Sequence, residues 1–131
     1  MIALTHLCII LFGMMTGFFY AYSVSVVPGL DVSDPGAAVE AMRGINVAVR
    51  NPVFFATFFL APFAALLAGC LYLRAGALRP GAFLIASAFI YVLGAIGPTS
   101  LINAPMNDAL AVAEVTDAAA VWDAFAPDWT L

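Results

Sequence analysis

The sequence contains few charged residues: four arginines and eight acids make up only 9% of its 131 residues, and there is no lysine. Apolar residues account for 65% of the chain, against roughly 45–50% in an ordinary soluble domain. A chain this short cannot bury so much apolar surface in water, because small domains keep a large surface-to-volume ratio. The composition therefore excludes an ordinary soluble domain and predicts that the lipid bilayer is the main partner of this protein.

Cysteine and histidine are also scarce. Cys8 and Cys70 form no CxxC motif, which excludes a disulfide framework. His6 is the only histidine, and a metal centre needs several ligands, so we expect no metal and no other cofactor. The net charge of −4 leaves no basic surface for nucleic acid, which we also exclude as a partner.

Three windows have the length and composition of membrane spans, at about 2–27, 52–73 and 80–102. Each must be helical, because a helix satisfies its own backbone hydrogen bonds in lipid. We expect the first window to be a retained span rather than a cleaved signal peptide, since it lacks a basic leader and exceeds the apolar length of a signal core. The sequence predicts an all-α integral membrane helical bundle that forms one domain over 1–131.

Shorter amphipathic helices are expected on the membrane surface, over about 35–50 and 106–125. Asp34-Pro35 is a typical helix start, and Asn46 falls on the apolar side of the helix that follows. Asn51-Pro52 is a second start of the same kind. The Gly97-Pro98 pair should loosen the third span near its end.

The arginines predict the orientation in the cell membrane. Arg74 and Arg79 flank a short turn without acids, and such turns usually stay in the cytoplasm. Residues 25–51 and 103–131 would then lie on the outer side. Arg43 and Arg50 in the first connection argue for the opposite orientation. In either case three spans place both connections on the same face of the membrane.

On a helical wheel, the first span has one arc of small and polar residues and an opposite arc of large apolar ones. We expect the first arc to face protein and the second to face lipid. The first arc contains His6, Gly13, Thr16, Gly17, Tyr20 and Ser23, and the second contains Leu4, Leu7, Ile10, Leu11, Met14 and Phe18. Gly13 and Gly17 form a GxxxG pair, which is typical of close helix packing.

The stretch "SLINAPMND" (100–108) follows about twenty almost uncharged residues. It has two interpretations. In one, Asn103 and Pro105 end the third helix while Asn107 and Asp108 cap the next. In the other, these side chains also belong to a site, together with Asn46 and Asn51 on the same membrane face.

An ordered set of motifs resembles the anthrone oxygenase-like family of small integral membrane proteins. The motifs are "PGL" (28–30), "AMRGIN" (41–46), "NPVFFATFF" (51–59), "TSLINAPMNDALA" (99–111) and "VWDAF" (121–125), followed by Trp129. The family normally has four spans, so the resemblance implies a fourth helix after Leu131.

The resemblance implies an oxygenase that converts anthrones to anthraquinones. An anthrone has an acidic C–H, and its carbanion can pass an electron to O₂, so a base, oxyanion donors and a dry aromatic pocket suffice. The candidate catalytic residues are Asn103, Asn107, Asp108, Tyr91, Tyr20 and His6. The candidate substrate-binding residues are Asn46, Asn51, Phe55, Phe58 and Trp122, although packing or lipid contact also explains the phenylalanines.

A second hypothesis is a non-catalytic membrane module. It would be an accessory subunit of a larger complex, or a protein that binds lipid or a quinone. The expected partners under the two hypotheses are a small aromatic or quinone-like molecule and either a second copy of the chain or other membrane subunits.

Overall fold

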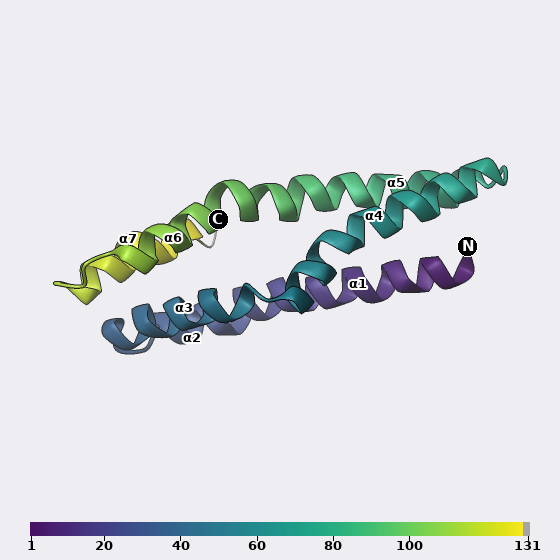
Figure 1. Ribbon diagram of the computed structural model, residues 1–131. Helices are drawn as coiled ribbons and strands as arrows, with labels where there is room; N and C mark the ends of the chain where they lie inside the picture. The colour runs from purple at the N-terminus through teal and green to yellow at the C-terminus, as the bar shows by residue number, and fades with distance from the viewer. Residues whose placement is uncertain (130–131) are drawn as a thin grey trace. The chain divides into compact units, whose positions relative to one another are not determined.

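The computed structural model describes residues 1–129, and all regular structure in them is helical (Figure 1). The prediction of an all-α fold is therefore confirmed. The helices are α1 (Ile2–Ala21), α2 (Val27–Asp31), α3 (Pro35–Val49), α4 (Pro52–Arg74), α5 (Leu78–Tyr91), α6 (Ala104–Val112) and α7 (Ala118–Trp129). Three π-helical segments also occur: η1 (Tyr22–Val26), η2 (Val92–Ile96) and η3 (Thr99–Asn103). The fourth span expected after Leu131 lies outside the described residues.

Three helical stretches are long and apolar enough to cross a membrane: Ile2–Asp31, Pro52–Arg74 and Leu78–Val112. This confirms the prediction of three helices able to span a membrane, although the first and third stretches run beyond the predicted 2–27 and 80–102. The first and third stretches contain 30 and 35 residues, or about 45 and 52 Å of helix. Both exceed the ~30 Å hydrocarbon core, so each extends beyond it.

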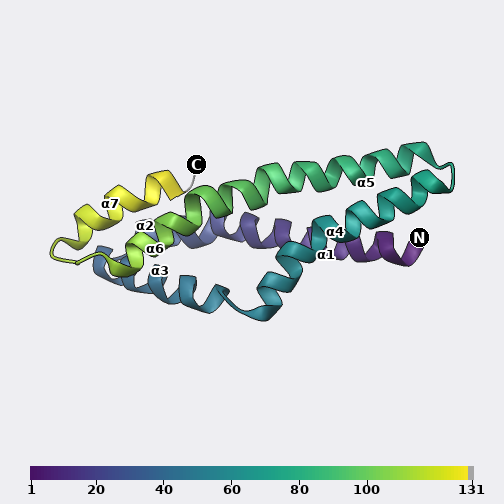
Figure 2. The same cartoon turned by 45° about the horizontal axis from the view of Figure 1, so that its top comes forward.

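The contacts divide the chain into two compact units. Unit 1 comprises residues 1–17 and 52–98, and unit 2 comprises residues 18–51 and 99–131, described here to Trp129. In unit 1, α4 and α5 lie side by side and are joined by a tight turn (Figures 1 and 2). Gly76 adopts φ +79° in that turn, where its N–H donates to the Leu73 carbonyl while Ala77 donates to Tyr72. This is the Schellman geometry that favours glycine.

Glycine also allows α4 and α5 to approach closely. A Cβ on Gly69 would lie 2.6 Å from Ile85 Cγ1 and 3.0 Å from the Gly81 carbonyl oxygen. A Cβ on Gly81 would lie 2.9 Å from the Gly69 carbonyl oxygen. The two glycines therefore set the separation of these helices.

The core of unit 1 lies between α1, α4 and α5. It contains Cys8, Leu11, Ala61, Ala64, Ala65, Ala68 and Ala88, with Phe12 and Tyr91 packed against it. The prediction that the small and polar arc of the first span faces protein is wrong. Gly13 and Gly17 have nothing within 4 Å of an added Cβ, and His6 is exposed. The alanine face of α4 instead receives larger side chains, because a smooth surface fits protruding ones.

The core of unit 2 is built by α3, α6 and α7. It contains Ala38, Val39, Met42, Leu110, Trp122, Phe125 and Ala126. Helix α3 starts at Pro35, and the Asp34 carboxylate accepts from the Ala37 N–H at 3.0 Å. Asn46 lies on the buried face of α3 with an exposed fraction of 7%.

Two local predictions for the last part of the chain are wrong. The third helix does not end at Asn103 and Pro105, since helical structure continues from Leu78 to Val112, and the Asn103 side chain makes no capping bond. The surface helix expected over 106–125 is two helices, α6 and α7, separated by 113–117. Asp117 caps α7 by accepting from the Ala120 N–H. The π-helical segments η2 and η3 flank Gly97-Pro98, where the backbone loosens but stays helical.

Candidate functional site

The asparagines of "SLINAPMND" are bonded to the last residue of α7. The Asn103 Nδ2 donates to the Trp129 carbonyl oxygen at 2.9 Å, and the Trp129 indole Nε1 donates to Asn107 Oδ1 at 2.8 Å. An indole N–H can only donate, so this contact determines which way the Asn107 amide faces. The Asn107 Nδ2 has no hydrogen-bond partner within residues 1–129, and its two N–H groups remain free to donate.

Asn46 supplies a second amide without a partner. Its Nδ2 is buried and makes no hydrogen bond in the described chain. Burying an amide without a hydrogen bond costs roughly 1–3 kcal/mol, so a buried orphan donor calls for an explanation. One explanation is a hydrogen-bond acceptor on a ligand.

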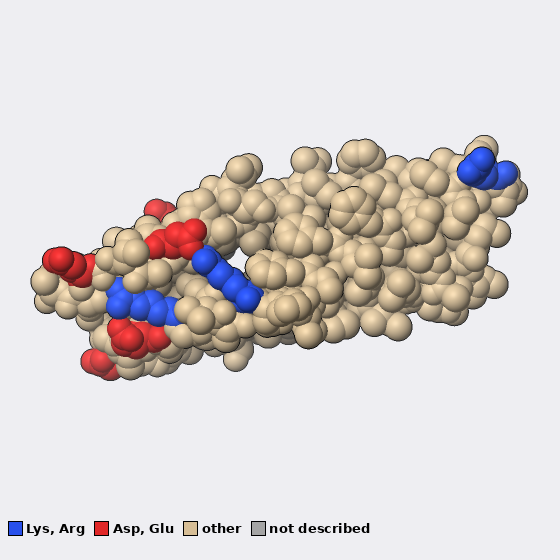
Figure 3. Space-filling model, viewed as in Figure 1, with Lys and Arg blue, Asp and Glu red and all other residues tan. Residues whose placement is uncertain are grey.

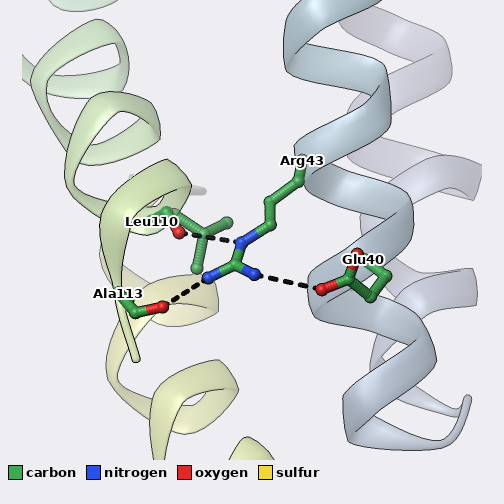
Figure 4. Close-up of polar contacts among 4 residues, drawn as sticks. All are labelled: Glu40, Arg43, Leu110 and Ala113. Carbon is green, nitrogen blue, oxygen red and sulfur yellow. Dashed lines mark hydrogen bonds and ion pairs between the residues drawn. The ribbon is translucent and has the colours of Figure 1, made fainter. Parts of the chain in front are cut away.

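Two arginines connect α3 to α6: Arg43, which lies within α3, and Arg50, which is its C-cap residue. Arg43 donates to the carbonyl oxygens of Leu110 and Ala113, at 2.9 and 2.7 Å, and to Glu40 at 3.0 Å (Figure 4). Arg50 pairs with Asp108. Arg43 thus contacts the C-terminal end of α6, whereas Arg50, later in the sequence, contacts a residue nearer its N-terminus. The two helices are therefore antiparallel. Asn46 lies between the two arginines in the sequence and is buried on α3.

A second polar contact joins α7 to the end of α2. The Trp122 indole Nε1 donates to Asp31 Oδ1 at 2.9 Å. Beside this contact is an open-sided cavity of about 290 Å³, lined by Asp31, Trp122, Asp123, Ala126 and Pro127. This volume is just below the roughly 300–1,000 Å³ typical of small-molecule sites.

Aromatic rings connect these contacts along α7. Trp122 and Phe125 have ring centroids 5.8 Å apart, Phe125 and Trp129 are 6.4 Å apart, and Tyr22 is 5.5 Å from Trp129. These spacings are typical of aromatic packing. The rings form an apolar wall from which the two indole N–H groups reach Asp31 and Asn107.

Charge is divided unequally between the units. Unit 2 contains all eight acids and two of the four arginines, for a side-chain net charge of −6, whereas unit 1 contains only Arg74 and Arg79. On the face of unit 1 drawn in Figure 3, blue appears only where α4 meets α5. The remainder of that face shows no charged side chain, as expected of a surface in contact with lipid.

The structure places part of the predicted site in unit 2. Asn46, Asn103, Asn107 and Trp122 belong to the contacts described above. Asn51 is exposed and its Nδ2 donates to the Ala48 carbonyl oxygen at 2.9 Å. Asp108 and Tyr20 are exposed, and Asp108 pairs with Arg50. The predicted caps at Asn107 and Asp108 are wrong, because both side chains bind residues distant in sequence.

The other predicted residues belong to unit 1. Phe58 is buried, with its ring centroid 5.9 Å from that of Tyr91, and Phe55 is exposed and stacks on Phe59. The Tyr91 hydroxyl is buried without a hydrogen-bond partner in the described chain. His6 is exposed on α1.

Asp31, Asp123 and the hydrogen bonds of Trp129 were not predicted from the sequence. Asp31 had a recognisable signal, since it is the first charged side chain after thirty uncharged residues. Asp123 had none. Within residues 1–129, no three His, Cys, Asp or Glu side chains are grouped so that they could hold a metal ion.

A family profile described as Anthrone oxygenase matches residues 52–131. The matched region includes Asn103, Asn107, Trp122 and Trp129 but not Asp31 or Asn46. No curated protein and no solved structure matches the chain significantly.

Proposed function

The chain belongs to the anthrone oxygenase family, and from this membership we propose that it oxidises a flat aromatic molecule of the anthrone type with O₂. The reaction replaces the two hydrogens of the acidic CH₂ group with a carbonyl oxygen, and the second oxygen atom of O₂ leaves as water. Removal of one proton gives a delocalised carbanion, whose negative charge lies largely on the ketone oxygen. That carbanion reduces O₂, and stabilising it is the enzyme's main task.

The Asn107 amide is the observation that carries this proposal. The Trp129 indole holds its oxygen, so its two N–H groups face away from that bond. A donor whose orientation is fixed before the substrate arrives stabilises a developing oxyanion without reorganising. The buried, unpartnered Nδ2 of Asn46 is the second donor. Asn103 is assigned a positioning role, because its Nδ2 already binds the Trp129 carbonyl.

The test measures O₂ consumption and quinone formation by the full-length protein in detergent or nanodiscs, with an anthrone as substrate. Asn107→Asp keeps an oxygen for the Trp129 indole but removes both amide N–H groups. We expect kcat/KM to fall about 10²–10³-fold, the usual effect of losing one oxyanion donor. Thr116→Asp adds the same charge at an exposed position of unit 2 and should change the rate less than about twofold.

Two results would contradict the proposal. One is an Asn107→Asp protein that oxidises the anthrone at the wild-type rate. The other is a folded wild-type protein that consumes no O₂ with a panel of anthrones and hydroquinones. If that inactive protein still binds the ring systems, the alternative of a non-catalytic binder of lipid or quinones replaces the oxygenase.

We further propose that the turn between α4 and α5 is cytoplasmic, with residues 25–51 and 103–131 on the outer side of the cell membrane. Arg74 and Arg79 at this turn are the only charged side chains of unit 1, which supports the assignment. The proposed substrate would then reach unit 2 from the outer face.

A further inference from the structure

The oxidation proposed above needs a base, and the cavity beside α7 contains one. Asp31 and Asp123 are the carboxylates among its lining residues, which also include Ala126 and Pro127. An aromatic substrate can place a ring edge against the apolar lining while its C–H points at a carboxylate. Among the catalytic residues predicted from the sequence, Tyr20 and Asp108 of unit 2 could also accept a proton, but they do not line this cavity.

Asp31 differs from Asp123 because it is oriented. The Trp122 indole donates to its Oδ1 at 2.9 Å, which leaves Oδ2 without a hydrogen bond in the described chain. Trp122 has an exposed fraction of 5%, so the donor is held by the core of unit 2. A base whose carboxylate is held by a packed neighbour is ready for proton transfer.

Helix stability does not account for Asp31. It is the last residue of α2, where the negative end of the helix dipole disfavours a carboxylate by about 0.3–1 kcal/mol. A neutral acceptor would satisfy the Trp122 indole equally well. A charged side chain at this position is better explained by chemistry in the cavity.

We propose that Asp31 is the catalytic base, and that the cavity holds the ring edge with the acidic C–H. This inference rests on the proposed oxygenase function. Asp31 Oδ2 takes the proton, the C–H electron pair enters the ring system, and the carbanion transfers one electron to O₂. The resulting radical and superoxide combine into a peroxide anion, which takes the proton back from Asp31. Asp31 then removes the second C–H proton as the O–O bond breaks, the carbonyl forms and hydroxide leaves. The proton on Asp31 passes to this hydroxide, which gives water and restores the carboxylate.

The spacing along α7 agrees with this arrangement. Trp122 holds Asp31 and Trp129 holds Asn107, and the two tryptophans are seven residues apart, about 10 Å along the helix. In an anthrone the CH₂ group and the ketone lie on opposite sides of the central ring. A base within ~3 Å of the CH₂ group and an N–H donor within ~3 Å of the ketone oxygen would be separated by a distance similar to that between the two tryptophans.

The test separates proton removal from oxidation. An anthrone deuterated at its CH₂ group is incubated with the full-length protein without O₂, and loss of deuterium to water is measured by mass spectrometry. Asp31→Asn keeps an oxygen for the Trp122 indole but removes the base. We expect enzyme-catalysed exchange to fall about 10²–10⁴-fold, with an unchanged melting temperature. Asp128→Asn makes the same chemical change at an exposed position of α7 and should leave exchange at the wild-type rate.

The two proposals can fail separately. Exchange at the wild-type rate in Asp31→Asn would overturn the role of Asp31, even if O₂ consumption supports the oxygenase. Absence of catalysed exchange in the wild-type protein would also overturn it. Asp31-dependent exchange without any O₂ consumption would support the base and refute the oxygenase. If Asp31→Asn does not fold, Asp31→Glu replaces it: moving the carboxylate by one methylene should slow exchange at least about tenfold, and wild-type exchange would refute the proposal.

Discussion

At the scale of single residues, the contacts of unit 2 depend on side chains that can only donate hydrogen bonds. The indoles of Trp122 and Trp129 orient Asp31 and Asn107, and the Arg43 guanidinium binds Leu110 and Ala113. The Arg43 contacts reach backbone carbonyls at the C-terminal end of α6, where few partners remain within the helix. The Leu110 carbonyl also accepts from the Ala113 N–H at 3.4 Å. These side chains therefore hold α6 and α7 in the positions that the proposed site requires.

Arg43→Lys should destabilise the protein, because an ammonium group cannot reproduce the guanidinium's three bonds from one fixed plane. We expect a loss of about 1–3 kcal/mol, and a melting temperature in detergent lower by several degrees. Glu40→Gln is the control, since the Glu40 side chain is 71% exposed and an exposed ion pair contributes about 0–1 kcal/mol. Equal melting temperatures for Arg43→Lys and the wild type would mean that α6 does not depend on Arg43.

At the scale of elements, the helices pack through side-chain size rather than polarity. Polar and small residues of the first span were predicted to face protein, yet α1 buries Cys8, Leu11 and Met15. The alanine-rich face of α4 explains this result, because it leaves room for larger side chains of a neighbour. Close packing through glycine occurs between α4 and α5, at Gly69 and Gly81, and not at the GxxxG pair of α1.

Gly69→Ala should weaken the α4–α5 pair. The added Cβ would lie 3.0 and 3.2 Å from backbone atoms of Gly81 and Ile85, which cannot move without shifting a helix. We expect a cost of about 1–3 kcal/mol and a lower melting temperature. Gly13→Ala adds the same methyl group to a helix where nothing lies within 4 Å, and should be neutral or slightly stabilising. Equal melting temperatures for the two variants would show that α4 and α5 do not need a glycine at position 69 to pack closely.

At the scale of the whole molecule, the distribution of charged residues and the length of the apolar helices indicate which parts of the chain can lie in the membrane. Unit 1 has only the two arginines of the α4–α5 turn, while unit 2 has all eight acids. The first and third helical stretches are longer than the hydrocarbon core is thick. Their length therefore allows Asp31 and Asp108 to lie outside the hydrocarbon core, where the proposed site would be reached from both lipid and water.

The proposed orientation predicts which residues a membrane-impermeant maleimide can reach. In a background with Cys8 and Cys70 replaced by alanine, Ala75→Cys should be labelled only after the cells are opened, because arginine-rich turns stay in the cytoplasm. Ala119→Cys, an exposed position of α7, should be labelled in intact cells. The reverse pattern would show the opposite orientation.

The candidate site could be predicted from the sequence only in part. Asn46 was expected on the inner side of its helix and is buried there, because the apolar period of α3 sets its face. The partners of Asn103 and Asn107 were not predictable. Capping is a local interaction, whereas the observed contacts join residues 26 and 22 positions apart, and Trp122 reaches a carboxylate 91 positions away.

The sequence alone determined the helical class, the three spans and the helix starts at Pro35 and Pro52, since apolar length and proline geometry act within a few turns of chain. Only the tertiary structure decided which face of α1 is buried, which acceptors the two indole N–H groups bind and where a cavity remains. Those features depend on how the surfaces of different helices fit together after folding, and the sequence pattern of any one helix does not specify that fit.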